Sequence, residues 1–169
     1  AAYPYICKWN GTAFSPVGVA GAIDDDVYAL TFDAAGNLYV GGMFENAGGV
    51  ANADYIAKWN GSQWEALGTG VDSSVWGITV DFDKVYVAGT FTSAGGQTLT
   101  DRVAVWSNGA WQQLDINFPA TASVYSVLRA SDGSLYIGGS FTSIQAGENA
   151  KTGQVVPNLN VTSASANTY

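Results

Sequence analysis

Leu38-Tyr39-Val40-Gly41-Gly42-Met43-Phe44 is the stretch that decides how this chain folds, because it occurs three times. It returns as Val85-Tyr86-Val87-Ala88-Gly89-Thr90-Phe91 and as Leu135-Tyr136-Ile137-Gly138-Gly139-Ser140-Phe141. A second motif, Lys8-Trp9-Asn10-Gly11, returns as Lys58-Trp59-Asn60-Gly61 and more loosely as Val105-Trp106-Ser107-Asn108-Gly109. Its tryptophans lie 50 positions apart (59 − 9) and then 47 (106 − 59). The chain is therefore built from repeats of nearly fifty residues.

Each repeat contains four short segments with the pattern of a β-strand. Apolar and polar residues alternate in them, Val, Tyr, Phe and Trp are frequent, and short breaks containing Gly separate them. Asn-Gly pairs between the third and fourth segments predict hairpin turns, because both residues tolerate a positive φ. We predict first strands at 27–33, 75–81 and 124–130, second strands at 38–44, 85–91 and 135–141, third strands at 5–9, 55–59 and 102–106, and fourth strands at 13–17, 63–67 and 110–114.

Four antiparallel strands in a repeat of this length are typical of a β-propeller blade. We therefore predict an all-β fold, a single partial propeller over residues 1–169 with about three and a half blades. Its parts are a half blade at 5–18 (third and fourth strands), blades at 27–68 and 75–115, a degenerate blade at 124–157, and the start of a further blade at 167–169.

This number of blades is too small for a ring, since propellers close with about four to eight. We expect the chain to be a segment of a longer repeat protein, with later sequence supplying the first and second strands of the half blade. Two copies of a half ring are the alternative. It is the weaker one, because neither end of the chain supplies those strands.

Five columns of aromatic residues align across the repeats and hold every tryptophan of the chain. We predict that they pack blade against blade, because large rings bury much apolar surface at modest entropic cost. A sugar-stacking platform is the alternative. The columns are Trp9/Trp59/Trp106, Phe14/Trp64/Trp111, Tyr28/Trp76/Tyr125, Tyr39/Tyr86/Tyr136 and Phe44/Phe91/Phe141.

Two residues depart from their columns. Cys7 is the only cysteine, which excludes an intrachain disulfide, and it takes the place of Ala57 and Ala104, so we expect a small buried side chain. Arg129 takes the place of Phe32 and Val80 on the first strand. We expect its stem to pack and its guanidinium to reach solvent at the strand end, with binding of an anion or a carboxylate as the alternative.

The composition excludes several functions. Only 12% of residues are charged, Lys and Arg number six, and the net charge is −8, which argues against nucleic-acid partners and anionic membrane surfaces. The chain has no His, which removes the commonest general base and metal ligand. No apolar run is long enough to insert into a membrane. This composition favours an extracellular, cell-surface or virion-surface β-protein.

The order Gly-x-Leu-Tyr-Val-Gly-Gly followed by Lys-Trp-Asn-Gly-x-x-Trp resembles kelch-like β-propeller repeats over essentially the whole chain. The segment Phe91-Thr92-Ser93-Ala94-Gly95-Gly96 is similar to the variant found in large bacterial secreted and phage-associated proteins. The resemblance implies adhesion, surface display or particle assembly, and its motifs specify the fold better than the function. Kelch-type copper oxidases need histidine ligands, so their activity does not carry over.

In kelch-type blades, the loops between strands two and three and between blades emerge on one face. Here these loops would hold nine acidic residues: Asp24, Asp25, Asp26, Glu45, Asp54, Asp72, Asp101, Asp115 and Glu148. Such a face would attract a basic partner or bind Ca²⁺, for which Asp24, Asp25 and Asp26 are weak candidates. A solvated rim is the plainer interpretation. We predict no other cofactor.

No acid–base or nucleophile arrangement recurs in the repeats, so we predict no enzyme and no catalytic residue. We expect a non-catalytic binding or structural module that presents loops for adhesion or recognition to a protein or a glycan. Further blades or neighbouring subunits would complete the propeller. The alternatives are a structural subunit of an extracellular assembly, such as a phage tail or a filament, and a fragment of a propeller-type glycoside hydrolase or lyase.

Overall fold

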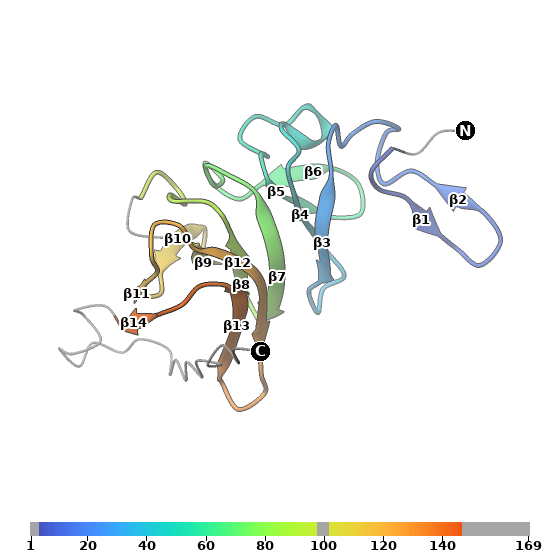
Figure 1. Ribbon diagram of the computed structural model, residues 1–169. Helices are drawn as coiled ribbons and strands as arrows, with labels where there is room; N and C mark the ends of the chain where they lie inside the picture. Colours follow the sequence, from blue (N-terminus) through green and yellow to red (C-terminus); the bar gives the residue numbers. More distant parts are fainter. Residues whose placement is uncertain (1–3, 98–101, 147–169) are drawn as a thin grey trace, which may run out of the picture.

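The computed structural model describes residues 4–97 and 102–146, and two four-stranded antiparallel sheets form its centre (Figure 1). Blade 1 contains β3 (Val27–Phe32), β4 (Leu38–Gly42), β5 (Ile56–Trp59) and β6 (Trp64–Ala66). Blade 2 contains β7 (Val75–Asp81), β8 (Lys84–Gly89), β9 (Val103–Ser107) and β10 (Ala110–Gln113). In both blades the strands lie side by side in chain order. The predicted all-β class is confirmed, and the described residues form no closed ring.

Three two-stranded sheets flank the blades. A hairpin of β1 (Lys8–Trp9) and β2 (Phe14–Ser15) precedes blade 1, and a hairpin of β12 (Ser123–Arg129) and β13 (Leu135–Ser140) follows blade 2. β11 (Ile116–Asn117) pairs with β14 (Gln145–Ala146), and a 3₁₀ turn, η1, spans Ala47–Gly49. The part of the predicted degenerate blade at 124–157 that follows residue 146, and the predicted start of a further blade at 167–169, lie outside the described residues.

The third strands begin later than predicted. Tyr55 and Arg102 have φ angles of 59° and 64°, in the left-handed region, and β5 and β9 start one residue after them. The N–H of Tyr55 donates to the carbonyl of Phe44 (2.8 Å), and its own carbonyl accepts from the N–H of Gly42 (3.0 Å). These loop hydrogen bonds hold the residue outside the regular ladder. The prediction that the strand includes this residue was wrong.

The second glycine of the repeated motif is required by a close backbone approach. A Cβ at Gly42 would lie 2.0 Å from the carbonyl oxygen of Asp26, and a Cβ at Gly89 would lie 2.0 Å from that of Ser74. The first glycine of the motif faces side chains instead, and blade 2 has Ala88 at this place, fully buried. The motif therefore keeps glycine where two backbones meet.

Aromatic columns do pack between neighbouring repeats. The rings of Tyr28 and Trp76 stack at 4.4 Å between centroids, and Trp76 meets Tyr125 edge-on at 5.7 Å. Gly68, in the loop after β6, leaves room for the indole of Trp106. A Cβ added at Gly68 would lie 2.9 Å from this indole. Where a repeat lacks a neighbour, the aromatics are exposed, as Trp9 shows.

Cys7 and Arg129 both differ from expectation. Cys7 is exposed, because β1 pairs only with β2 in the described part of the chain, whereas Ala57 lies in the interior of a four-stranded sheet. The guanidinium of Arg129 contacts other residues of the chain, and its side chain is only 13% exposed. It pairs with the carboxylate of Asp81 across the blade boundary (Nε–Oδ2 3.1 Å) and lies 5.5 Å from the centroid of the Tyr86 ring. This ion pair lies within the chain, so the alternative of an anion or carboxylate ligand stays a prediction.

Candidate interaction surfaces

The loops before β3 and β7 and the loops after β4 and β8 meet at one end of the blades, which we call the loop end. Oδ1 of Asp24 accepts a hydrogen bond from the N–H of Glu45 (2.9 Å). Oδ1 of Asp72 accepts from the N–H groups of Thr92 (2.8 Å) and Ser93 (2.9 Å), and its Oδ2 accepts from the Thr92 hydroxyl (2.7 Å). Asp24 and Asp72 each lie three residues before the first strand of a blade. An aspartate side chain that accepts hydrogen bonds from backbone N–H groups therefore fixes the loops of both blades.

The negatively charged carboxylates of the loop end lie near two tyrosines, Tyr28 and Tyr55. Burial raises the pKa of Tyr55, and the carboxylates of Glu45, Asp54 and Asp72 raise it further. Burial also raises the pKa of Tyr28, as do the nearby carboxylates of Asp26 and Asp25. The two phenols therefore stay protonated in a field of negative charge, as donors beside acceptors.

The pKa of Asp72 reflects how firmly its loop is held. Burial alone would raise this pKa, but the hydrogen bonds from Thr92 and Ser93 outweigh burial and hold it below its ordinary value. A shallow pocket of about 260 Å³ lies beside this carboxylate, between the loop after β6 and the loop after β8. The loop end is thus ordered by its own carboxylates.

The structure does not bring the calcium candidates together. The carboxylate of Asp24 points to the backbone of Glu45, and Oδ1 of Asp25 accepts from the N–H of Asp26 (2.7 Å). Within residues 4–97 and 102–146, no three His, Cys, Asp or Glu side chains are grouped so that they could hold a metal ion. Asp115 is buried after β10, with a φ of 53°. Asp101 and Glu148 lie outside the described residues.

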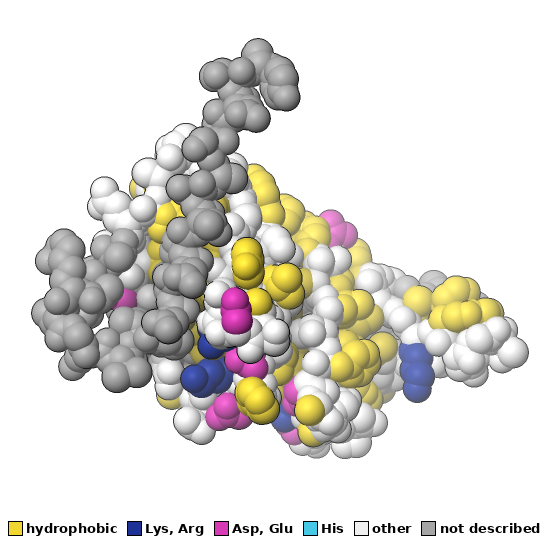
Figure 2. Space-filling view, turned by 90° about the horizontal axis from the view of Figure 1, so that it is seen from below, with side chains coloured by type: hydrophobic (Ala, Val, Ile, Leu, Met, Phe, Trp, Pro, Cys, Tyr) yellow, Lys and Arg dark blue, Asp and Glu magenta, His cyan; other side chains and the backbone are white. Residues whose placement is uncertain are grey.

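The opposite end, where the hairpin turns lie, differs in charge. There Lys58 pairs with Glu65 (3.0 Å), and Arg129 pairs with Asp81. Figure 2 views the molecule from below and shows dark blue and magenta side chains next to one another. Basic and acidic side chains therefore lie together at this turn end, whereas the described residues of the loop end carry exposed carboxylates and no exposed Lys or Arg.

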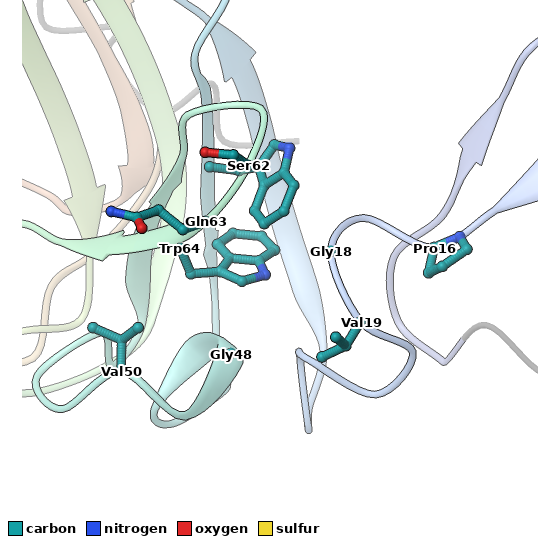
Figure 3. Close-up of a pocket in the computed structure, with 9 residues that line it drawn as sticks. Pro16, Gly18, Val19, Gly48, Val50, Ser62, Gln63 and Trp64 are labelled. Atoms are coloured by element: carbon teal, nitrogen blue, oxygen red, sulfur yellow. The ribbon is translucent and has the colours of Figure 1, made fainter.

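A pocket of about 770 Å³ opens between the β2–β3 loop and blade 1 (Figure 3). Trp59 is among the residues that line it. Trp64 faces the segment of Gly18 and Val19, and its indole nitrogen points toward Gly18. This Nε1 is buried and has no hydrogen-bond partner in the part of the chain that the structure describes. The equivalent nitrogen of Trp111 donates to the carbonyl of Leu67 (2.8 Å). The pocket therefore marks a looser fit between the first hairpin and blade 1.

The sequence did not lead us to predict a structural role for Arg102. Its side chain is buried and donates to the carbonyls of Ala122 (2.6 Å), Ala120 (2.6 Å) and Phe91 (2.9 Å), joining blade 2 to the loop before β12. The sequence does contain a sign of this role, because the other two repeats have tyrosine (Tyr5 and Tyr55) at the position of Arg102. An arginine there supplies several donors for loop carbonyls.

Among the described residues, no helix has the length and apolar character needed to cross a membrane. Comparison with models of protein families and with curated proteins gave no match.

Proposed function

We propose that this chain is a non-catalytic binding module that presents its loop end to a basic protein surface. The observation that carries the proposal is the repeated use of Asp24 and Asp72 to fix the loops of two successive blades through backbone hydrogen bonds. Loops that are ordered before binding lose less conformational entropy on binding. The module would belong to a secreted, cell-surface or virion-surface protein.

The chemistry of the loop end favours a partner rich in Lys and Arg. Asp25, Asp26 and Glu45 are exposed there, and the net charge of −8 steers positively charged partners toward the chain. The phenols of Tyr28 and Tyr55 lie among these carboxylates, where their oxygens would accept hydrogen bonds from an approaching guanidinium or ammonium group and their rings would offer it a π face.

The test uses the full chain and an array of short peptides with graded Lys and Arg content, beside a glycan array. The Asp25→Asn/Asp26→Asn variant removes two exposed charges that do not tie one loop to another. The Asp83→Asn/Asp132→Asn variant removes the same charge at the turn end. We expect binding that rises with basic content and falls roughly tenfold in the first variant, because an exposed charge pair contributes up to ~1 kcal/mol.

Three results would contradict the proposal. One is the absence of binding to basic peptides at low salt. Another is an equal loss of affinity in both variants, which would show only a net-charge effect. The third is binding confined to the glycan array, which would assign the surface to a different class of ligand.

A structural subunit of an extracellular assembly is the second candidate function. It is favoured by a specific observation, since the flanking hairpins β1–β2 and β12–β13 are each paired only within themselves in the described part of the chain. Exposed strand edges of this kind invite pairing with another chain.

A further inference from the structure

Against the expectation that neither end of the chain supplies the missing strands, the two flanking hairpins are complementary halves of one blade in the described part of the chain. The β12–β13 hairpin holds a first and a second strand, and the β1–β2 hairpin holds a third and a fourth. In both complete blades the second strand pairs with the third in the same register. Leu38 faces Trp59 and Val40 faces Ala57 in blade 1, and Val85 faces Trp106 and Val87 faces Ala104 in blade 2.

We propose that a second copy of this chain adds its β1–β2 hairpin to the outer edge of β13, completing a four-stranded blade from two molecules. The two hairpins of one copy cannot meet, since β1–β2 projects beyond blade 1 while β13 lies beyond blade 2 (Figure 1). The register of the complete blades then places Cys7 of the second copy opposite Ile137, and its Trp9 opposite Leu135. This interface is separate from the loop end and does not depend on the function proposed for it.

Side-chain exposure shows where the second copy would dock. Tyr136 is 52% exposed, whereas its equivalents Tyr39 and Tyr86, each covered by the next blade, are 8% and 1% exposed. Figure 2 shows hydrophobic side chains at the surface of the molecule, both across its middle and on the lobe of the first hairpin. The uncovered face of β13 continues the kind of interface that the chain already forms twice within itself.

The opposite face of blade 1 supplies the matching surface. In the chain, Val75 and Ile78 of blade 2 fit against Gly41 of blade 1, within 3 Å of where a Cβ at that glycine would lie. Leu30 is the equivalent of Ile78 and is 55% exposed, because no blade precedes it in the described residues. Docking of a second copy would place its Leu30 over Gly138, which is the equivalent of Gly41.

The sequence favours this hairpin as the occupant of the β13 edge. Tyr5-Ile6-Cys7-Lys8-Trp9-Asn10-Gly11 differs from Tyr55-Ile56-Ala57-Lys58-Trp59-Asn60-Gly61, the segment that occupies this edge in blade 1, only at Cys7. Residues 147–169 contain no tryptophan and no Asn-Gly turn. Each copy would then hold two complete blades and share two, so two copies would form six blades, within the range in which propellers close.

Light scattering on the full chain tests the stoichiometry. We expect a mass of about twice 17.6 kDa, and a return to 17.6 kDa in Tyr136→Glu, which adds a charge to the proposed interface on a residue that is half exposed in a single copy. Phe82→Glu is the matched control, because Phe82 is 90% exposed in the β7–β8 turn, and it should keep the doubled mass.

Disulfide cross-linking tests the register. Directly opposite residues of antiparallel strands have Cβ atoms about 5 Å apart, close enough for a disulfide after a small shift. Ile137→Cys should therefore form, on mild oxidation, an intermolecular disulfide between position 137 of one copy and Cys7 of the other. Phe82→Cys should not form the equivalent bond. A single-copy mass at high concentration, or a dimer in which Ile137→Cys does not cross-link to Cys7, would overturn the proposal.

Discussion

Replacing Gly89 by Ala tests the reason for the glycine in the repeated motif. The new Cβ would lie 2.0 Å from the carbonyl oxygen of Ser74, which also accepts a hydrogen bond from the N–H of Thr90 (3.1 Å). Relief of the clash requires the two backbones to separate by at least about an ångström, since real Cβ atoms essentially never lie within 3.0 Å of another atom. Backbone displacement of this kind costs about 1–3 kcal/mol, and the strained hydrogen bond adds about 1 kcal/mol. We expect a loss of about 2–4 kcal/mol.

Urea unfolding followed by tryptophan fluorescence measures this loss. Gly96→Ala is the control, because nothing lies within 4 Å of its Cβ position and only its φ of 74° opposes a side chain. That strain costs roughly 1–2 kcal/mol. If Gly89→Ala is no more destabilising than Gly96→Ala, backbone crowding does not explain the motif.

Three further perturbations test separate contacts. Trp111→Phe should destabilise the chain by about 1 kcal/mol more than Trp64→Phe, because only Trp111 donates to a carbonyl of the preceding repeat in the described part of the chain, and equal losses in urea unfolding would contradict this. The pKa of Asp72 is lower in the folded chain than its ordinary value of 3.8, so its contribution to stability is full above that value and is lost as pH falls through the lowered pKa. Asp72→Asn should therefore make urea midpoints less sensitive to pH below about 4, and an unchanged acid dependence would count against the loop tie. Arg129→Met should cost about 1–2 kcal/mol, and much less in an Asp81→Asn background, whereas additive losses in this double-mutant cycle would show that the ion pair contributes little.

The sequence predicted the blades well because strand periodicity and turn chemistry are local properties. The strands of both complete blades and the Asn-Gly hairpin turns lie within a residue or two of the expected positions. The main error, at Tyr55 and Arg102, has a non-local cause, since hydrogen bonds to a neighbouring loop hold these residues in the left-handed region. Backbone conformation imposed by another segment leaves no local pattern to detect.

Side-chain roles were harder to predict than strands. The plainer interpretation of the acidic loop residues is a solvated rim, with calcium or a basic partner as alternatives, yet Asp24 and Asp72 accept hydrogen bonds from backbone N–H groups that come within reach only after the blades fold. Cys7 was expected to be buried like Ala57 because the two share a column. Its exposure follows from which strands lie beside β1, and a column of aligned residues carries no such information.

The chain-order arrangement of strands within each blade bears on how the protein reaches its folded state. Every hairpin in blade 1 and blade 2 joins segments adjacent in the sequence, and the longest connections between paired strands, at 43–55 in blade 1 and 90–102 in blade 2, are equal in length. Short loops close at little entropic cost, and folding slows as the contacts that must form become more distant in the chain. We therefore expect each blade to nucleate on its own hairpins and to dock on its neighbour afterwards. The flanking hairpins, which pair only within themselves in the described part of a single copy, would be the last segments of that copy to gain protection from amide hydrogen exchange and the first to lose it.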